Sequence, residues 1–270
     1  MKKTNFQKLA VSSFGTRWGG PFLAMLALCL FAGAVSSPSA NPAAAPQMVS
    51  YPSGNETVSG YLALPDGGGK HPGLIAIHEW WGLNDQVKEE ARKFAAQGYV
   101  VLAVDMYRGK VATTPDEAHE LMRGVPADRA ARDLEAAFTY LSARPDVNAG
   151  KIGVVGWCMG GGYSIRFAVI EPKLAACIVN YGSLPTDPAN IAKITAPVLG
   201  NFGADDRGIT PASVQAFASA MKSDGKSVDV KVYDGAGHAF ENPNNKDGYR
   251  PAAAADAWDR MTAFLKKTLQ

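Results

Sequence analysis

The chain has 270 residues, 47% of them hydrophobic and 19% charged, with 27 basic and 25 acidic side chains. This length suits one globular domain with an appendage. A formal charge of +2, without any run of five like charges, argues against a phosphate-binding surface, so we expect no nucleic-acid partner. Three cysteines cannot staple so long a chain, which excludes a disulfide scaffold and leaves apolar burial as the source of stability.

The first 40 residues have the pattern of a secretory signal peptide with a spacer. Residues 1–46 hold four basic side chains and no acidic one, and the apolar run 22–31 lies within them. That run is too short to cross a hydrocarbon core about 30 Å thick, so a retained anchor is the weaker alternative and we expect no stable membrane span after cleavage. Small residues permit cleavage at several positions between Ala34 and Ala45. The sequence predicts a periplasmic or secreted protein whose net charge beyond the spacer is −2.

Residues 41–270 contain no repeat, low-complexity tract or second linker, and we expect them to form one domain. Short apolar runs predict strands, and the stretches between them predict helices. In chain order, the expected strands are 57–64, 73–78, 99–104, 152–155, 175–180, 198–202 and 228–232, and the expected helices are 85–97, 127–143, 159–170, 211–224 and 252–268. Because strands and helices alternate, we predict an α/β fold with a mostly parallel sheet of about eight strands, helices on both faces and no large cap domain. Catalytic groups on such a sheet lie at the carboxyl ends of its strands.

The segment Gly156-Trp-Cys-Met-Gly160 lies between a predicted strand and a predicted helix. This is the pattern of the nucleophile elbow of the α/β-hydrolase fold, with cysteine in the serine position, so it predicts Cys158 as the nucleophile. The glycines are needed because the elbow is a sharp turn packed against neighbouring elements. A helix N-terminus favours thiolate over thiol, and we expect this effect on Cys158. The alternative is a buried structural cysteine.

A base and an acid follow the nucleophile in the order that this fold uses. Asp205 and Asp206 come after the predicted strand 198–202, and both are candidates for the acid. His238 comes after the last predicted strand and is the candidate base. His71, before a proline in a turn, and His119, on a charged helix, are expected to be solvated.

The segment Ile77-His-Glu-Trp-Trp-Gly82 follows the first buried strand, where this fold supplies one oxyanion-hole N–H. We therefore expect the amides of Trp80 and Met159 to form the oxyanion hole. Gly82 occupies the place of the second histidine of a zinc motif, so no metal is expected. Glu79, at a buried strand end, must be paired, protonated or functional, and a structural salt bridge is the alternative to a functional role.

Together, the cysteine elbow, the Glu79 segment and the two loops that carry the aspartates and His238 resemble the dienelactone hydrolases (carboxymethylenebutenolidases), over about residues 48–268. The resemblance implies Cys158 as nucleophile, His238 as base and Asp206, rather than Asp205, as the residue that orients the base. It also implies that Glu79 holds the resting thiol and helps to ionise it when substrate arrives, and that Arg108 binds substrate. It implies no cofactor.

Two features depart from the family. The position of the second substrate arginine carries Asn242, and the chain has an export pattern. Loss of a charged clamp costs a carboxylate-bearing substrate about 1.5–3 kcal/mol, so the substrate can differ from dienelactone. Trp81 beside the site suggests binding of an apolar or aromatic group.

The expected function is hydrolysis of a small ester or lactone through a Cys-His-Asp triad and a thioester intermediate, by a monomer. A thioesterase, a peptidase or another acyl hydrolase is the nearest alternative, and a thiol redox sensor or a ligand-binding protein on this scaffold is the non-enzymatic one. Cys177 is predicted mid-strand, too far from Cys158 for a disulfide.

Overall fold

A computed structural model describes residues 45–270, so the predicted signal peptide lies outside the described residues. The described chain folds around an eight-stranded sheet in the order β1-β2-β4-β3-β5-β6-β7-β8. The strands are β1 (Gln47–Ser53), β2 (Glu56–Ala63), β3 (His71–Ile77), β4 (Val100–Val104), β5 (Val147–Trp157), β6 (Ala176–Asn180), β7 (Val198–Gly203) and β8 (Val228–Tyr233). The pairs β1–β2 and β2–β4 are antiparallel, and the other neighbours are parallel. The predicted α/β fold with a mostly parallel sheet is confirmed.

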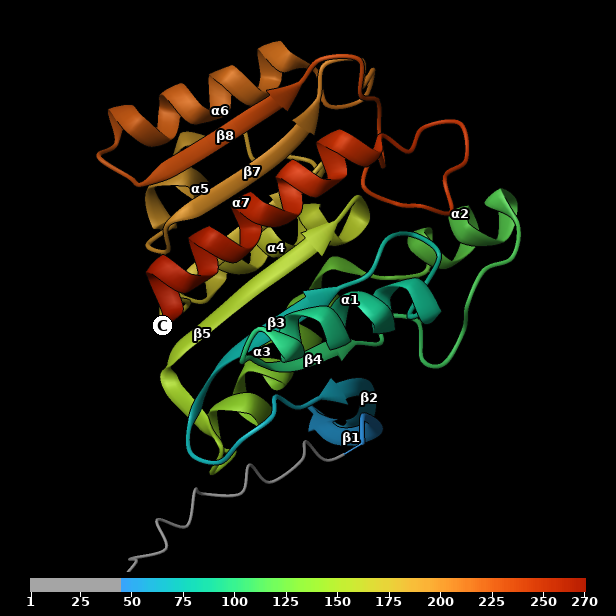
Figure 1. Cartoon of the computed structure of the whole chain (residues 1–270), viewed down its shortest axis with the longest axis vertical. Coiled ribbons are helices and arrows are strands. Elements are labelled where there is room, and N and C mark those ends of the chain that lie inside the picture. The colour runs from blue at the N-terminus through green and yellow to red at the C-terminus, as the bar shows by residue number, and fades with distance from the viewer. Residues whose placement is uncertain (1–44) are drawn as a thin grey trace, which may run out of the picture. The chain divides into compact units, whose positions relative to one another are not determined.

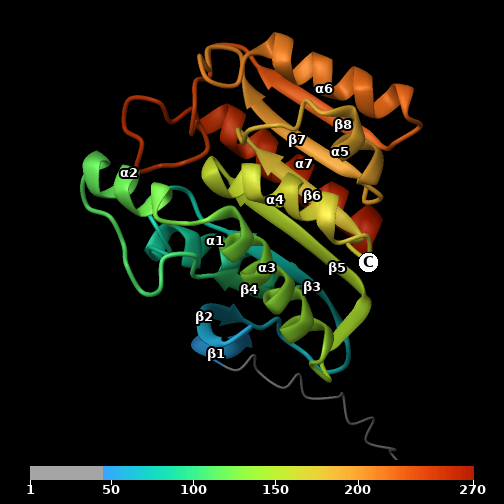
Figure 2. The same cartoon turned by 180° about the vertical axis from the view of Figure 1, so that it is seen from behind.

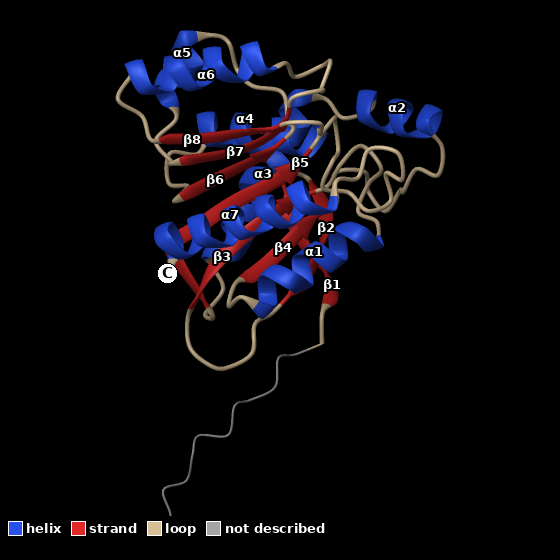
Figure 3. Cartoon of the chain, turned by 45° about the horizontal axis from the view of Figure 1, so that its top comes forward, coloured by secondary structure: helices blue, strands red, loops and turns tan. Residues whose placement is uncertain are grey.

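Helices cover both faces of the sheet, as Figures 1 and 2 show from opposite sides. The helices are α1 (Asp85–Ala96), α2 (Pro115–Arg123), α3 (Ala127–Ser142), α4 (Met159–Ile170), α5 (Pro188–Lys193), α6 (Pro211–Ser223) and α7 (Pro251–Leu269). One face packs against α1 and α7, and the other packs against α3, α4 and α6, so that each face has its own apolar core. The sheet is the middle layer in Figure 3. No described helix is long and apolar enough to span a bilayer.

The central strands are continuously apolar because both of their faces are covered. All five residues of β4 and all five of β6 are buried. Edge strand β1 lacks this pattern, since it contains Pro52 and the exposed polar residues Gln47 and Ser50, which explains why the apolar runs do not predict it. Helices α2 and α5 are also absent from the predicted ranges, although His119 of α2 was expected on a helix. The six residues of α5, which begin at a proline, are too few to show a helical period.

The parallel register brings the carboxyl ends of β3, β5, β6, β7 and β8 to one edge of the sheet. The segments that follow these strands carry Glu79, Cys158, Tyr181, Asp206 and His238. Residues more than 150 positions apart in the chain therefore meet at this edge, which is where such sheets hold their active sites.

Candidate active site

Cys158 stands in a strained turn between β5 and α4. Its φ is 55° and its ψ is −116°, a conformation that a non-glycine residue adopts only when its surroundings force it. The Cys158 N–H donates to the carbonyl oxygen of Asn180 at 3.0 Å, which anchors the turn to β6. A Cβ on Gly156 would lie 2.1 Å from the Gly160 oxygen, so the turn closes only with glycine there. This geometry is that of a nucleophile elbow.

Gly160 provides a test of how tightly the elbow is built. A Cβ at this position would lie 2.2 Å from the Ile77 carbonyl oxygen and 2.6 Å from that of His78. We expect Gly160→Ala to push α4 away from β3 and to cost about 3 kcal/mol or more, which lowers Tm by about 6–12 °C for a domain of this size. Gly68→Ala is the matched control, because nothing lies within 4 Å of its Cβ. Equal melting temperatures for both variants in calorimetry would contradict this expectation.

Cys158, His238 and Asp206 form a connected chain of contacts. His238 Nε2 lies 3.1 Å from Cys158 Sγ, and its Nδ1 lies 2.7 Å from Asp206 Oδ2. Asp206 is only 5% exposed, and its Oδ1 accepts hydrogen bonds from the N–H groups of Gly208 and Ile209. The neighbouring Asp205 is exposed to solvent. Of the two aspartates left open by the spacing, only Asp206 is positioned to orient His238.

The thiol of Cys158 is protonated in the resting site. Burial raises its pKa to about 12, and the charges of Glu79 and Asp206 raise it further, whereas N–H groups of Met159 and Trp80 lower it. The N–H group of Met159 at the helix N-terminus thus favours the thiolate, as expected, but its effect is not large enough to make the thiolate the resting form. Desolvation of the charged form outweighs the effect of the local N–H donors.

The backbone N–H groups of Trp80 and Met159 both act on Cys158 Sγ and lower the pKa of its thiol. They come from different elements, since Trp80 follows β3 and Met159 begins α4. These are the two amides named from the sequence as the oxyanion hole. Two N–H donors beside a thiol can also stabilise negative charge that develops on a carbonyl oxygen bound next to it.

Glu79 is 4% exposed and accepts two hydrogen bonds. Tyr181 Oη donates to its Oε1 at 3.1 Å, and Asn242 Nδ2 donates to its Oε2 at 2.6 Å. Burial raises the pKa of Glu79, and these two donors offset the rise only in part. No hydrogen bond joins Glu79 to the thiol within residues 45–270, although the family resemblance implied that Glu79 holds it. An ionised Glu79 raises the pKa of Cys158, which is opposite to helping its ionisation.

Glu79→Gln tests this electrostatic effect. Because an ionised Glu79 disfavours the thiolate, the variant should lower the pKa of Cys158 and move the pH profile of thiol alkylation to lower pH. The folded chain binds a proton on Glu79 more tightly than the unfolded chain, so stability falls as pH rises from the unfolded pKa to the folded one. Glu79→Gln should therefore raise Tm more at pH 8 than at pH 4. Glu135→Gln, at an exposed position, is the control, and an unchanged profile would leave Glu79 with a structural role.

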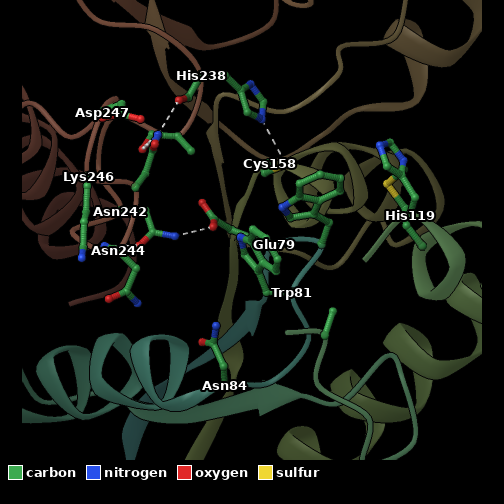
Figure 4. Close-up of a pocket in the computed structure, with 15 residues that line it drawn as sticks. Glu79, Trp81, Asn84, His119, Cys158, His238, Asn242, Asn244, Lys246 and Asp247 are labelled. Carbon is green, nitrogen blue, oxygen red and sulfur yellow. Dashed lines mark hydrogen bonds between the residues drawn. The ribbon is translucent and has the colours of Figure 1, made fainter. Parts of the chain in front are cut away.

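A cavity of about 820 Å³ opens onto this site (Figure 4). Cys158, His238 and Glu79 all line it, and so does Trp81, for which we expect a role in substrate binding. The other lining residues are Trp80, Asn84, Ala112, His119, Met122, Ala239, Asn242, Asn244, Asn245, Lys246 and Asp247. The cavity thus joins an apolar and aromatic wall to a polar wall formed by the segment 242–247.

His119 is exposed, as expected, and it also lies at the cavity. It is carried by α2, and its ring lies edge-on to that of Trp80 with centroids 4.8 Å apart. The capping box formed by Thr114 and Glu117 starts this helix, and the same pattern is visible in the sequence. Trp80 also contacts Trp81 at a centroid distance of 5.1 Å. Three rings therefore form one continuous aromatic wall.

Arg108 does not line the cavity. Its guanidinium pairs with Glu56 at 2.7 Å and with Asp133 at 2.8 Å. The substrate-binding role that the resemblance implied is not supported by this position, because two carboxylates already neutralise the charge. Lys246 is the only lysine or arginine among the described residues that line the cavity.

Tyr181 is the residue at this site that the sequence analysis missed. It directly follows β6, at the sheet edge where catalytic groups were expected, and its φ of 38° is unusual for a side chain of its size. Its ring lies edge-on to that of His238 with centroids 5.4 Å apart, while its hydroxyl holds Glu79. Tyr181 therefore contacts both His238 and Glu79.

Cys177 is buried in β6, and both cysteines of the described chain are free. The expectation that Cys158 and Cys177 form no disulfide is confirmed.

Known proteins of one family are similar to this chain over most of its length. The profile of the "Dienelactone hydrolase family" matches residues 58–269. "Protein usf" of Aquifex pyrophilus is 36% identical over 230 residues, covering 83% of this chain and 99% of the relative. The "Putative carboxymethylenebutenolidase" of Aquifex aeolicus is 31% identical over 231 residues, covering 83% of this chain and 99% of the relative. The crystal structure of a dienelactone hydrolase-like promiscuous phosphotriesterase from metagenomic libraries is 25% identical with a TM-score of 0.78, covering 85% of this chain and 100% of that one.

Proposed function

The chain belongs to the dienelactone hydrolase family, and from this premise we propose that it hydrolyses a small ester or lactone by covalent catalysis at Cys158. The observation that carries the proposal is the pair of contacts made by His238. One ring nitrogen faces the thiol at 3.1 Å, and the other faces the buried carboxylate of Asp206 at 2.7 Å. This is the arrangement that activates a nucleophile through a base held in place by an acid.

In the first half of the reaction, Cys158 Sγ attacks the carbonyl carbon and its proton passes to His238 Nε2. Because burial raises the pKa of the thiol to about 12, we propose that attack and proton transfer are coupled and do not begin from a preformed thiolate. The negative oxygen of the tetrahedral intermediate accepts hydrogen bonds from the amides of Trp80 and Met159. Collapse breaks the bond to the leaving oxygen, which takes the proton from His238. For a lactone, the released hydroxyl stays attached to the acyl group.

In the second half, His238 takes a proton from a water molecule that attacks the thioester. The tetrahedral intermediate collapses by breaking its carbon–sulfur bond, Cys158 Sγ takes the proton from His238, and the carboxylic acid leaves. Asp206 keeps the ring of His238 oriented in both halves and stabilises its charged form. No cofactor takes part in these steps.

The cavity supports a substrate with an apolar or aromatic acyl group. The wall formed by Trp80, Trp81 and His119 can contact such a group over a large area. Asn242 is uncharged, and its side-chain amide donates a hydrogen bond to Glu79. This position therefore offers no positive charge to bind a substrate carboxylate. We therefore propose that uncharged esters and lactones are preferred over carboxylate-bearing ones.

The raised pKa of the Cys158 thiol also bears on the non-enzymatic alternative. Redox-sensing cysteines depend on an accessible thiolate, which is the form that burial disfavours here. A role as a thiol redox sensor is thus less well supported than hydrolysis.

The test is a panel of substrates assayed with the purified protein. Phenyl acetate, a γ-lactone, a thioester and the free-acid and methyl-ester forms of one unsaturated lactone should be followed at equal concentration. We expect turnover of the uncharged esters and lactones, with kcat/KM for the methyl ester at least tenfold above that for the free acid. If the whole panel reacts no faster than in buffer, the proposal is wrong.

We also propose that residues 1–40 direct export of the monomeric enzyme. The basic start and the apolar run that follows it support this proposal. Fractionation of cells that express the full chain, with N-terminal sequencing of the product, tests it. We expect a chain in the periplasm or medium that begins between residues 35 and 46, whereas a cytoplasmic chain that keeps residue 1 would contradict export.

A further inference from the structure

Trp157, immediately before the nucleophile, makes a hydrogen bond that the proposed reaction does not use. Its indole Nε1 donates to Glu241 Oε2 at 3.0 Å, across 84 residues of sequence. Glu241 lies three residues after His238 in the loop between β8 and α7. The bond therefore joins the residue next to the nucleophile to the loop that carries the base.

This bond has no substitute among the described side chains. The segment 156–160 and the loop 235–242 are joined by two side-chain hydrogen bonds within residues 45–270, the Cys158–His238 contact itself and the Trp157–Glu241 bond. His238 is otherwise held from β7 through Asp206, and the elbow is otherwise held from β6 through Asn180. The distance between Sγ and Nε2 thus depends on two segments that share only these two side-chain hydrogen bonds within residues 45–270.

The hydrogen bond between Trp157 and Glu241 is buried, where polar groups are desolvated at a cost in the free energy of folding. Trp157 is 4% exposed, and its ring packs near that of Phe94 in the core beneath the site. Glu241 Oε1 is buried and has no hydrogen-bond partner in the described chain. Burial, followed by the nearby charges of Glu90 and Glu79, raises the pKa of Glu241 against the lowering effect of the Trp157 N–H. Apolar residues at both positions would avoid these costs, so the bond is not explained by stability alone.

We propose that Glu241 is a positioning residue that holds the nucleophile and the base at reacting distance through its hydrogen bond to Trp157. This inference rests on the proposed function, because it assigns a task within the Cys158–His238 pair. Glu241 lines a second cavity of about 230 Å³ rather than the one that opens onto the thiol, so it acts on the geometry and not on the substrate.

Substitution of Glu241 by leucine or by glutamine distinguishes the effect of the hydrogen bond to Trp157 from the effect of the negative charge of Glu241. Glu241→Leu removes the acceptor at similar size, whereas Glu241→Gln keeps an oxygen that can accept from Trp157. A displacement of about 1 Å between reacting groups can cost about 100-fold in rate, so we expect Glu241→Leu to lower kcat by about 10- to 100-fold with KM changed less than about threefold. Glu241→Gln should keep kcat within about threefold of the wild type.

A double-mutant cycle with Trp157→Phe identifies the partner. If the bond is what matters, Trp157→Phe lowers kcat as Glu241→Leu does, and the double variant is no slower than the slower single one. If the fold-decrease in kcat of the double variant equals the product of the two single fold-decreases, the two residues act separately and the proposal is overturned. A Glu241→Gln variant as slow as Glu241→Leu would overturn it too, since charge would then be the cause.

A second measurement, which needs no substrate, distinguishes failure of this inference from misfolding of the variant and from failure of the proposed function. Alkylation of Cys158 by iodoacetamide depends on the His238 contact, and we expect it to be at least threefold slower in Glu241→Leu but unchanged in Glu241→Gln, at equal Tm. Wild-type enzyme and Cys158→Ala are assayed alongside. An unchanged kcat and alkylation rate in Glu241→Leu, in an assay where Cys158→Ala is inactive, contradicts only this inference. Turnover retained by Cys158→Ala contradicts the proposed function instead.

Discussion

Replacing Cys158 with alanine should abolish ester hydrolysis, lowering kcat by a factor on the order of 10⁴ or more. The methyl group cannot form the thioester, and water alone would have to attack the carbonyl beside the oxyanion donors. Initial rates with p-nitrophenyl acetate, measured with wild-type and variant protein of verified fold, give the result. KM should change little, since the cavity walls that contact the substrate are untouched.

Cys177→Ala is the matched control for this experiment. Cys177 is the other cysteine of the described chain, it is buried in β6, and burial disfavours its thiolate as well. We expect this variant to keep its kcat within about twofold while losing some stability to the small cavity that it creates. A Cys158→Ala variant that retains more than a few per cent of the wild-type rate would exclude Cys158 as the nucleophile.

Replacing His238 with alanine should lower kcat by a factor on the order of 10³ or more, because within residues 45–270 no other basic side chain makes a hydrogen bond to the thiol. Burial holds the pKa of Cys158 at about 12, so without His238 the thiol must ionise against that cost before it attacks. The rate of iodoacetamide alkylation in this variant should rise steadily through pH 10 without reaching a plateau. A plateau near pH 7 in the variant would show that some other group activates the thiol.

The two neighbouring aspartates provide the control for this second experiment. Asp206→Asn keeps the shape of the side chain but loses the charge that orients His238 and stabilises its protonated form, so we expect a loss of kcat on the order of 10³. Asp205→Asn, at an exposed position on the same turn, should leave kcat within about twofold. Equal losses in both variants would contradict the assignment of Asp206.

The sequence predicts those parts of the fold that rest on burial and local chemistry. The central strands are apolar on both faces, and the elbow requires glycines around Cys158, so both are visible in the residues themselves. Edge strand β1 is not visible, since an exposed strand that contains Pro52 has no distinctive pattern. The order nucleophile, acid, base follows from the connections of the fold, but the choice between Asp205 and Asp206 depends on which side chain faces inward.

Other features depend on contacts that no local pattern contains. Tyr181 meets Glu79 across 102 residues, and Trp157 meets Glu241 across 84, so neither pair can be found from spacing. The resemblance implied that Arg108 binds substrate, but Glu56 and Asp133 bind its guanidinium away from the cavity. The protonated thiol is also unexpected, because the helix N-terminus is a local feature whereas the burial that outweighs it comes from the whole site.

The central claim, covalent catalysis at Cys158, is tested most directly by trapping the acyl-enzyme. Wild-type protein should be mixed with p-nitrophenyl acetate, quenched in acid within the first turnovers, digested and analysed by mass spectrometry. The expected result is one acetyl group on the peptide that contains Cys158, absent from the Cys158→Ala variant and accumulating in Asp206→Asn if hydrolysis of the thioester is slowed more than its formation. Steady turnover by the wild type with the acetyl group on another residue, or with no acylated peptide at any quench time, would contradict it.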